Sequence, residues 1–193
     1  MDAPGDRTPA SKRVLTVPNL ISLARIALIP VFWSLIVDED TTAWGIVLFG
    51  FVVATDWVDG TIARRTGQVS ELGKVLDPLA DRLAIAAGLI ALVVRGAFPL
   101  WAAALILVRD VLVLAAGAVL AGRGLRIDVR WIGKVATFTL MIAIPGVAWG
   151  TLGLWPAAAA LAIGWLAFVV GIVEYYAAAA VYASDLRTSL AGR

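Results

Sequence analysis

The chain has 193 residues, of which 61% are hydrophobic, and its formal net charge is only +2. This apolar share exceeds the roughly 45–50% of soluble domains and predicts an integral membrane protein. The small net charge argues against a nucleic-acid binder, and the absence of cysteine and histidine excludes disulfides, Cys/His zinc sites and an imidazole base.

Six apolar runs follow one another along the chain, each close to the roughly 20 residues that a membrane-spanning helix needs. They lie at about 20–37, 43–61, 78–95, 99–121, 132–150 and 155–182. The last run is long enough to extend beyond the bilayer or to contain a break. Because the runs are continuous, they favour helices over alternating barrel strands. We therefore expect an all-α, polytopic membrane protein whose six transmembrane helices form one domain at 18–185, between tails at 1–17 and 186–193.

Lysine and arginine gather in the N-terminal tail, in the connections 62–77 and 122–131, and after residue 182. The other connections carry little positive charge, and 38–42 reads DEDTT. The positive-inside rule then places both termini and the 62–77 connection in the cytoplasm. An even number of spans agrees with this topology. We expect a multi-pass protein of the cell's inner (plasma) membrane with cytoplasmic termini.

The stretch DWVDGTIARRTGQVSELGKVLDPLADR, residues 56–82, contains four aspartates beside apolar segments. On helices, the spacings of Asp56 with Asp59 and of Asp77 with Asp81 each put two carboxylates on one face. If the second and third spans pack side by side, all four converge near the cytoplasmic surface. Their repulsion and desolvation would force some to protonate unless a cation balances them. Oxygen ligands suit Mg²⁺, Mn²⁺ or Ca²⁺, as one ion or a close pair.

Small residues and an arginine lie among these aspartates. Gly60, Ala63 and Gly73 allow a ligand or a neighbouring helix to approach the backbone closely, and the guanidinium of Arg64 fits a phosphate. Together with a metal, they describe a pocket for a metal-bound phosphate or pyrophosphate. The simpler interpretation of Asp77, which precedes a proline, is an N-cap residue, but capping does not account for all four carboxylates.

The pattern D-x₂-D-G-x₂-A-R-x₈-G-x₃-D-x₃-D, met at every fixed position within 56–81, resembles the signature of the CDP-alcohol phosphatidyltransferase family. The first span, VPNLISLARIALIP, looks like the opening helix of that family. The resemblance implies the six-helix CDP-alcohol phosphatidyltransferase fold, a homodimer and a cytoplasmic-side active site. Such an enzyme moves a substituted phosphate from a CDP-linked donor to an alcohol and releases CMP.

The resemblance also implies roles for individual residues. It assigns metal binding to Asp56, Asp59, Asp77 and Asp81. It assigns contacts with the CDP part of the donor to Asp59, Gly60, Ala63, Arg64 and Gly73. It further makes Asp81 the base that deprotonates the acceptor hydroxyl, and without histidine a carboxylate must serve as that base. Two Mg²⁺ or Mn²⁺ ions would bridge the pyrophosphate and stabilise the leaving CMP.

The signature does not name the acceptor, so the remaining charges matter. Arg109 with Asp110 in the fourth run, Lys134 at the start of the fifth and Arg25 in the first are candidates to bind an anionic acceptor. Alternatively, Arg109 clamps helices or pairs with Asp110, and Lys134 extends to the membrane interface. Glu174 in the last run is a buried carboxylate candidate or a residue that fixes helix packing.

Two branches of the family remain open. TDWVDGTIARR and GKVLDPLADR look like the glycerol-3-phosphate phosphatidyltransferases, which make phosphatidylglycerophosphate, whereas RDVLVL and GKVATFTLM look like the cardiolipin synthases, which use phosphatidylglycerol. We expect CDP-diacylglycerol as the donor in both cases, with membrane lipids as surroundings. The alternatives are inositol phosphate as the acceptor, or a non-enzymatic magnesium transporter. A cation path gains nothing from Arg64 beside its ligands, which argues against the transporter.

Overall fold

The computed structural model describes residues 17–66, 73–122 and 131–191. Within these ranges the side chains are described except at 17–18, 56–66, 73–76, 78, 113, 116–122, 131–137, 175, 178–179 and 181–191. The described residues form the helices α1 (Val17–Val37), α2 (Thr42–Thr66), α3 (Gly73–Val94), α4 (Leu100–Gly122), α5 (Trp131–Thr151) and α6 (Ala157–Ala191). They contain no strand.

Each helix overlaps one apolar run of the sequence, so the predicted all-α fold of six helices is confirmed for the described residues. Among the helix starts, the largest difference lies at α3, which begins at Gly73 and not near residue 78. The prediction followed apolar content, and the polar residues before Pro78 resembled a loop. Asp77 is therefore an interior residue of α3 and not its N-cap.

Helix α6 is continuous over 35 residues. At 1.5 Å per residue it is about 52 Å long, which exceeds the roughly 30 Å of a bilayer's hydrocarbon core. The described helix contains no break between Ala157 and Ala191, and its extension beyond the bilayer stays a prediction. The division of the chain into tails and a catalytic domain at 18–185 stays a prediction.

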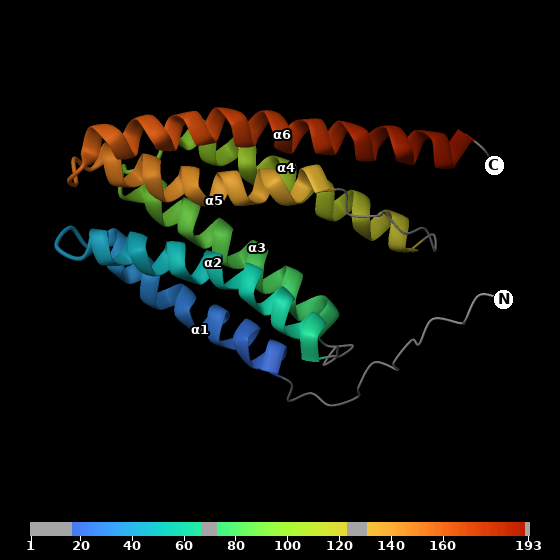
Figure 1. Cartoon of the computed structure of the whole chain (residues 1–193), viewed down its shortest axis with the longest axis horizontal. Helices are drawn as coiled ribbons and strands as arrows, with labels where there is room; N and C mark the ends of the chain where they lie inside the picture. Colours follow the sequence, from blue (N-terminus) through green and yellow to red (C-terminus); the bar gives the residue numbers. More distant parts are fainter. Residues whose placement is uncertain (1–16, 67–72, 123–130, 192–193) are drawn as a thin grey trace.

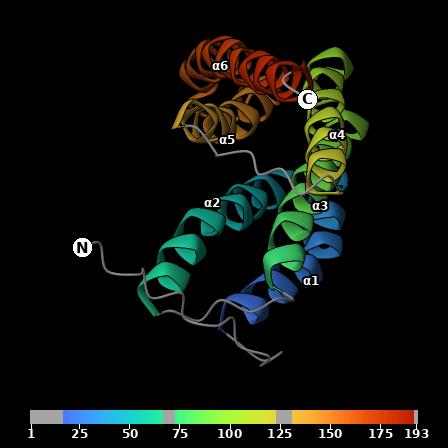
Figure 2. The same cartoon turned by 90° about the vertical axis from the view of Figure 1, so that its right-hand side faces the viewer.

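The helices fall into two groups joined by α4. In the first group α1 contacts both α2 and α3, and in the second α5 packs along α6 (Figures 1 and 2). Between the groups, α2 lies against α5, and α4 contacts both α3 and α6. The turns α1–α2 and α5–α6 lie at the left-hand end of Figure 1. The start of α1, the end of α2, the start of α3 and the end of α6 lie toward the other end. The two aspartate-bearing segments therefore share one end of the bundle.

The core lies where the two groups meet. Phe32 of α1 and Phe49 of α2 are fully buried, with ring centroids 5.4 Å apart. Ile106 of α4 and Val147 of α5 belong to the same buried cluster. Small residues allow close packing between α5 and α6, because a Cβ added at Gly164 would lie only 2.4 Å from the backbone nitrogen of Val147. Close approach through small residues is typical of helices that pack within membranes.

The outer surface carries large apolar side chains, as expected of a protein surrounded by lipid. Phe51, Val111 and Leu166 are each more than 60% exposed. Among the described residues, Asn19–Val37 and Ala157–Glu174 are long and apolar enough to cross a membrane, and Thr42–Thr55 and Phe138–Thr151 are shorter apolar stretches. Only 22% and 17% of the two long windows are buried within the protein, whereas the core helix of a soluble domain would be mostly buried.

Candidate active site

Helix α1 holds both aspartates of α3. The hydroxyl of Ser22 donates a hydrogen bond to Oδ1 of Asp77, and the guanidinium of Arg25 forms an ion pair with Oδ1 of Asp81. Ser22 and Arg25 are one helical turn apart, as are Asp77 and Asp81, so the two rows face each other across neighbouring helices. The predicted shared face of Asp77 and Asp81 is therefore present, and it is directed toward polar partners on α1.

The two polar partners on α1 are deeply buried. Ser22 is 3% exposed and Arg25 is 4% exposed, whereas Asp77 and Asp81 are only half-buried. A buried guanidinium is strongly destabilising unless an anion balances it. The carboxylate of Asp81 supplies that anion, so α1 and α3 are joined by charge as well as by apolar packing.

The α2 half of the predicted site lies outside the described side chains. Asp56, Asp59, Gly60, Ala63 and Arg64 belong to the last turns of α2, whose helical path is described but whose side chains are not. Gly73 is the first residue of α3. The convergence of all four carboxylates therefore stays a prediction. The packing of α2 against α3 is consistent with it.

The α3 residues suit a hard divalent cation. Asp77 and Asp81 offer only oxygen donors, which Mg²⁺ and Mn²⁺ prefer, and they project from adjacent turns toward the same neighbouring helix. Among the described side chains, no group of three or more potential ligands gathers at one place. A complete metal site therefore needs carboxylates beyond these two, and Asp56 and Asp59 are the predicted source.

A second charged cluster joins α3 to α4. The guanidinium of Arg82 donates to Oδ1 of Asp110 at 2.5 Å, and Nη1 of Arg109 lies 3.3 Å from the same oxygen. Arg109 and Asp110 are 5% and 6% exposed. The pairing of Arg109 with Asp110, one of the two alternatives raised by the sequence, is thus present.

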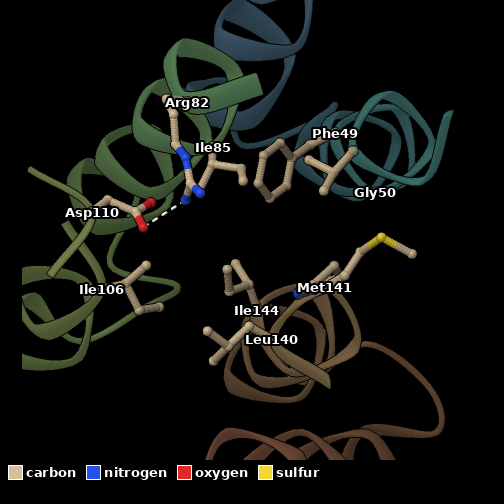
Figure 3. Close-up of a pocket in the computed structure, with 11 residues that line it drawn as sticks. Phe49, Gly50, Arg82, Ile85, Ile106, Asp110, Leu140, Met141 and Ile144 are labelled. Atoms are coloured by element: carbon tan, nitrogen blue, oxygen red, sulfur yellow. Dashed lines mark hydrogen bonds and ion pairs between the residues drawn. The ribbon is translucent and has the colours of Figure 1, made fainter. Parts of the chain in front are cut away.

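Beside this cluster, α2, α3, α4 and α5 surround a small, partly open hollow. Figure 3 shows Arg82 and Asp110 pointing toward each other on one side of it, with Phe49, Ile106 and Leu140 around the remainder. The lining is apolar apart from that ion pair. The hollow is therefore an apolar space beside the ion pair of Arg82 and Asp110. Arg82 directly follows Asp81 in α3.

The remaining candidates lie on α5 and α6. Oε2 of Glu174 accepts a hydrogen bond from the hydroxyl of Thr139 at 3.5 Å, which links α6 to α5. The hydroxyl of Tyr176 donates to the carbonyl of Leu105 at 3.0 Å and links α6 to α4. Glu174 thus takes part in helix packing. The side chain of Lys134 lies outside the described residues.

Two residues of the site were not predicted from the sequence. Ser22 stands alone in an apolar run, where a serine gives no signal of a partner. Arg82 ends the aspartate-rich stretch 56–82 but received no role in the sequence analysis. The signal that could have identified it is Asp110, because a carboxylate in an apolar run requires a cation from another helix.

Comparison with known proteins agrees with the pattern of aspartates. The model of the family described as CDP-alcohol phosphatidyltransferase matches residues 15–173. A "Putative cardiolipin synthase" of Mycobacterium tuberculosis is 38% identical over 176 residues, covering 90% of this chain and 84% of the relative. A "Cardiolipin synthase (CMP-forming)" of Streptomyces coelicolor is 35% identical over 181 residues, covering 91% and 84%.

A third relative carries a different name. The "CDP-diacylglycerol--glycerol-3-phosphate 3-phosphatidyltransferase" of Bacillus subtilis is 38% identical over 145 residues, covering 68% of this chain and 75% of the relative. The similarity to the two proteins named cardiolipin synthase thus extends over more of the chain. The level of identity alone does not separate the two branches.

Proposed function

Because the chain belongs to the CDP-alcohol phosphatidyltransferase family and is therefore a phosphatidyltransferase, we propose that it transfers the phosphatidyl group of CDP-diacylglycerol to phosphatidylglycerol, giving cardiolipin and CMP. The observation that supports this acceptor is similarity over about nine-tenths of the chain to proteins named cardiolipin synthase.

The proposed transfer forms one P–O bond and breaks another. The acceptor hydroxyl oxygen attacks the phosphorus that carries the diacylglycerol, and a new P–O bond forms. The bond between that phosphorus and the bridging oxygen breaks, and CMP leaves with its electron pair. The hydroxyl proton passes to the carboxylate of Asp81, which acts as the general base. Before metal binds, Ser22 and Arg25 hold the α3 carboxylates in place through their contacts with Asp77 and Asp81.

The metal ligands in this proposal are Asp56, Asp59, Asp77 and Asp81. Two bound Mg²⁺ or Mn²⁺ ions would neutralise the pyrophosphate and the charge that develops on CMP. The donor set, oxygen only, supports these ions over thiophilic metals. The chain contains no cysteine and no histidine, so thiolate and imidazole ligands are absent.

We assign the nucleotide part of the donor to the end of α2 and the start of α3. The residues concerned are Asp59, Gly60, Ala63, Arg64 and Gly73. Because Gly60 and Gly73 lack side chains, the diphosphate can approach the backbone closely there. Arg64 would pair with a phosphate oxygen through its planar fork of donors.

Arg109, Lys134 and Arg25 remain the candidates for binding the acceptor's phosphate. Arg109 is supported by its place in the charged cluster on α4, beside the apolar hollow. Arg25 lies at the proposed catalytic carboxylate, but it can reach an acceptor only by leaving Asp81. Lys134 rests on its position in the sequence alone.

Glycerol 3-phosphate is the second candidate acceptor, and the Bacillus subtilis relative is the observation that favours it. The product would then be phosphatidylglycerophosphate. The relatives described above are named for these two products, so inositol phosphate retains only the shared chemistry as support. The magnesium transporter is set aside, because the family to which the chain belongs consists of transferases.

We further propose that the protein lies in the cell's inner membrane as a homodimer, with both termini and the active site in the cytoplasm. The distribution of Lys and Arg in the sequence supports this topology. The fold agrees, since the aspartate-bearing ends of α2 and α3 lie toward the same end of the bundle as the start of α1 and the end of α6.

The test is a product assay with three acceptors. Purified protein is incubated with CDP-diacylglycerol, Mg²⁺ and either phosphatidylglycerol, glycerol 3-phosphate or inositol phosphate, and the lipid product and CMP are quantified. We expect cardiolipin and equimolar CMP with phosphatidylglycerol, no turnover with EDTA, and recovery with added Mg²⁺ or Mn²⁺. Phosphatidylglycerophosphate as the sole product would favour the second candidate. If none of the three acceptors supports CMP release, the proposed transfer in this pathway is overturned.

A further inference from the structure

Arg25 is a cation built into the wall of the proposed metal site. Its side chain is 3% exposed and forms an ion pair with Asp81, whose own side chain is 22% exposed. The carboxylate thus faces the protein on the Arg25 side and retains access from the other. One carboxylate therefore lies between a fixed guanidinium and the place where the proposed metal would bind.

The two carboxylates of α3 are held in different ways. Asp77 accepts a hydrogen bond from Ser22, a neutral donor, whereas Asp81 pairs with a full positive charge. A neutral donor orients a carboxylate without opposing a nearby cation. A guanidinium repels a divalent ion bound to the same carboxylate, and this repulsion is strong where water is scarce. Metal binding at Asp81 must therefore overcome or displace the contact with Arg25.

We propose that Arg25 is a positioning residue that occupies Asp81 in the metal-free protein and competes with the divalent cation for it. This inference rests on the metal site of the proposed function. Arg25 keeps the α3 carboxylate balanced before substrate and metal arrive, and it weakens the affinity for metal. On metal binding the guanidinium is released from Asp81 and becomes able to pair with another anion in the site.

The direct test is Mn²⁺ binding, measured without substrate by the electron paramagnetic resonance signal of free Mn²⁺. Arg25→Gln should bind Mn²⁺ about tenfold more tightly than the unmodified protein, because a unit positive charge a few ångströms from the ion has been removed. Arg25→Lys keeps the charge and should remain close to the unmodified protein. Arg95→Gln is the matched control, because Arg95 pairs with Glu39 and Thr42 at the opposite end of the bundle, and the Mn²⁺ affinity of this variant should not change.

Two Mn²⁺-binding results would overturn the proposed competition. Arg25→Gln that keeps its helical content and elution volume but binds Mn²⁺ equally or more weakly would show that Arg25 only joins α1 to α3, and would overturn the competition. If the unmodified protein binds no Mn²⁺, the proposed metal site fails and this inference fails with it. If the unmodified protein binds Mn²⁺ and the variants bind it equally well, the competition fails without a failure of the proposed metal site.

A second measurement does not depend on the folding of Arg25→Gln. The side-chain nitrogen resonances of ¹⁵N-arginine-labelled protein are followed during titration with diamagnetic Mg²⁺, and Arg25→Lys identifies the signal of Arg25 by its loss. We expect the Arg25 signal to shift and to saturate with the same Mg²⁺ concentration as metal binding. An Arg25 signal that stays constant while Mg²⁺ saturates the site would contradict displacement.

Discussion

Asp110 of α4 accepts a hydrogen bond from Arg82 of α3 at 2.5 Å, and its side chain is 8% exposed. Arg82 is adjacent to Asp81 in the sequence, so α4 holds the same segment of α3 that α1 holds through Arg25. Arg109 approaches the same oxygen of Asp110. One buried carboxylate thus balances charge for residues on two helices.

Replacing Asp110 with asparagine should therefore lower stability strongly. Removal of one member of a buried ion pair leaves its partner's charge poorly compensated and costs about 3–5 kcal/mol. The thermal unfolding midpoint in detergent is the measurement. Glu39→Gln is the control, because the side chain of Glu39 is 83% exposed and an exposed pair contributes about 1 kcal/mol or less. Equal midpoints for the two variants would mean that Asp110 does not stabilise the bundle.

Asp81→Asn should lower the rate of transfer by a factor of about 10² or more, as expected for the loss of a general base. It should also lower the unfolding midpoint, because the carboxylate that pairs with Arg25 has gone. The double variant Asp81→Asn with Arg25→Gln should recover stability but not transfer. The assays are CMP release and thermal unfolding of the same preparations. Substantial turnover of folded Asp81→Asn would remove Asp81 as the base.

Gly60→Val should block binding of the nucleotide, because a branched side chain would fill the space through which the diphosphate approaches the backbone. Gly60→Ala should weaken binding less, which makes the two substitutions a graded pair. Equilibrium dialysis with labelled CDP in the presence of Mn²⁺ measures the affinity. Near-normal affinity in Gly60→Val would count against a nucleotide site at the end of α2.

Gly164→Val should separate α5 from α6. A Cβ at this position would lie 2.4 Å from the backbone nitrogen of Val147 and 2.7 Å from the carbonyl carbon of Gly146, and backbone atoms cannot move aside cheaply. We expect a loss of about 1–3 kcal/mol, typical of overpacking. Ala162→Val adds the same kind of side chain at an exposed position of α6 and should be nearly neutral. Similar unfolding midpoints for both variants would contradict the close contact.

Hydropathy predicted the helices well, because a chain in lipid must satisfy its backbone hydrogen bonds within each apolar run. It failed at the start of α3, where the helix continues into polar residues that remain outside the apolar run. The same limit applies to α6, whose polar end extends the helix to Ala191. Apolar content marks the part of a helix that needs lipid and not the part that tolerates water.

The sequence predicted the acidic residues of the candidate site but not the α1 residues that contact them. The spacing of Asp77 and Asp81 predicted a shared face, which the contacts with α1 bear out. Arg25 was expected near the site, yet its pairing with Asp81 depends on the register between α1 and α3, which no single helix encodes. Ser22 illustrates the same point, since its role arises only from the helix beside it.

The central claim is that α2 and α3 bring their carboxylates together around divalent cations that hold the donor's diphosphate. Anomalous scattering from crystals grown with Mn²⁺ and CDP tests it most directly. We predict Mn²⁺ peaks about 2.0–2.3 Å from carboxylate oxygens of both helices, Asp56 and Asp59 from α2 and Asp77 and Asp81 from α3, with phosphate oxygens completing the coordination. Mn²⁺ bound by one helix alone, or CDP bound away from these aspartates, would contradict the account.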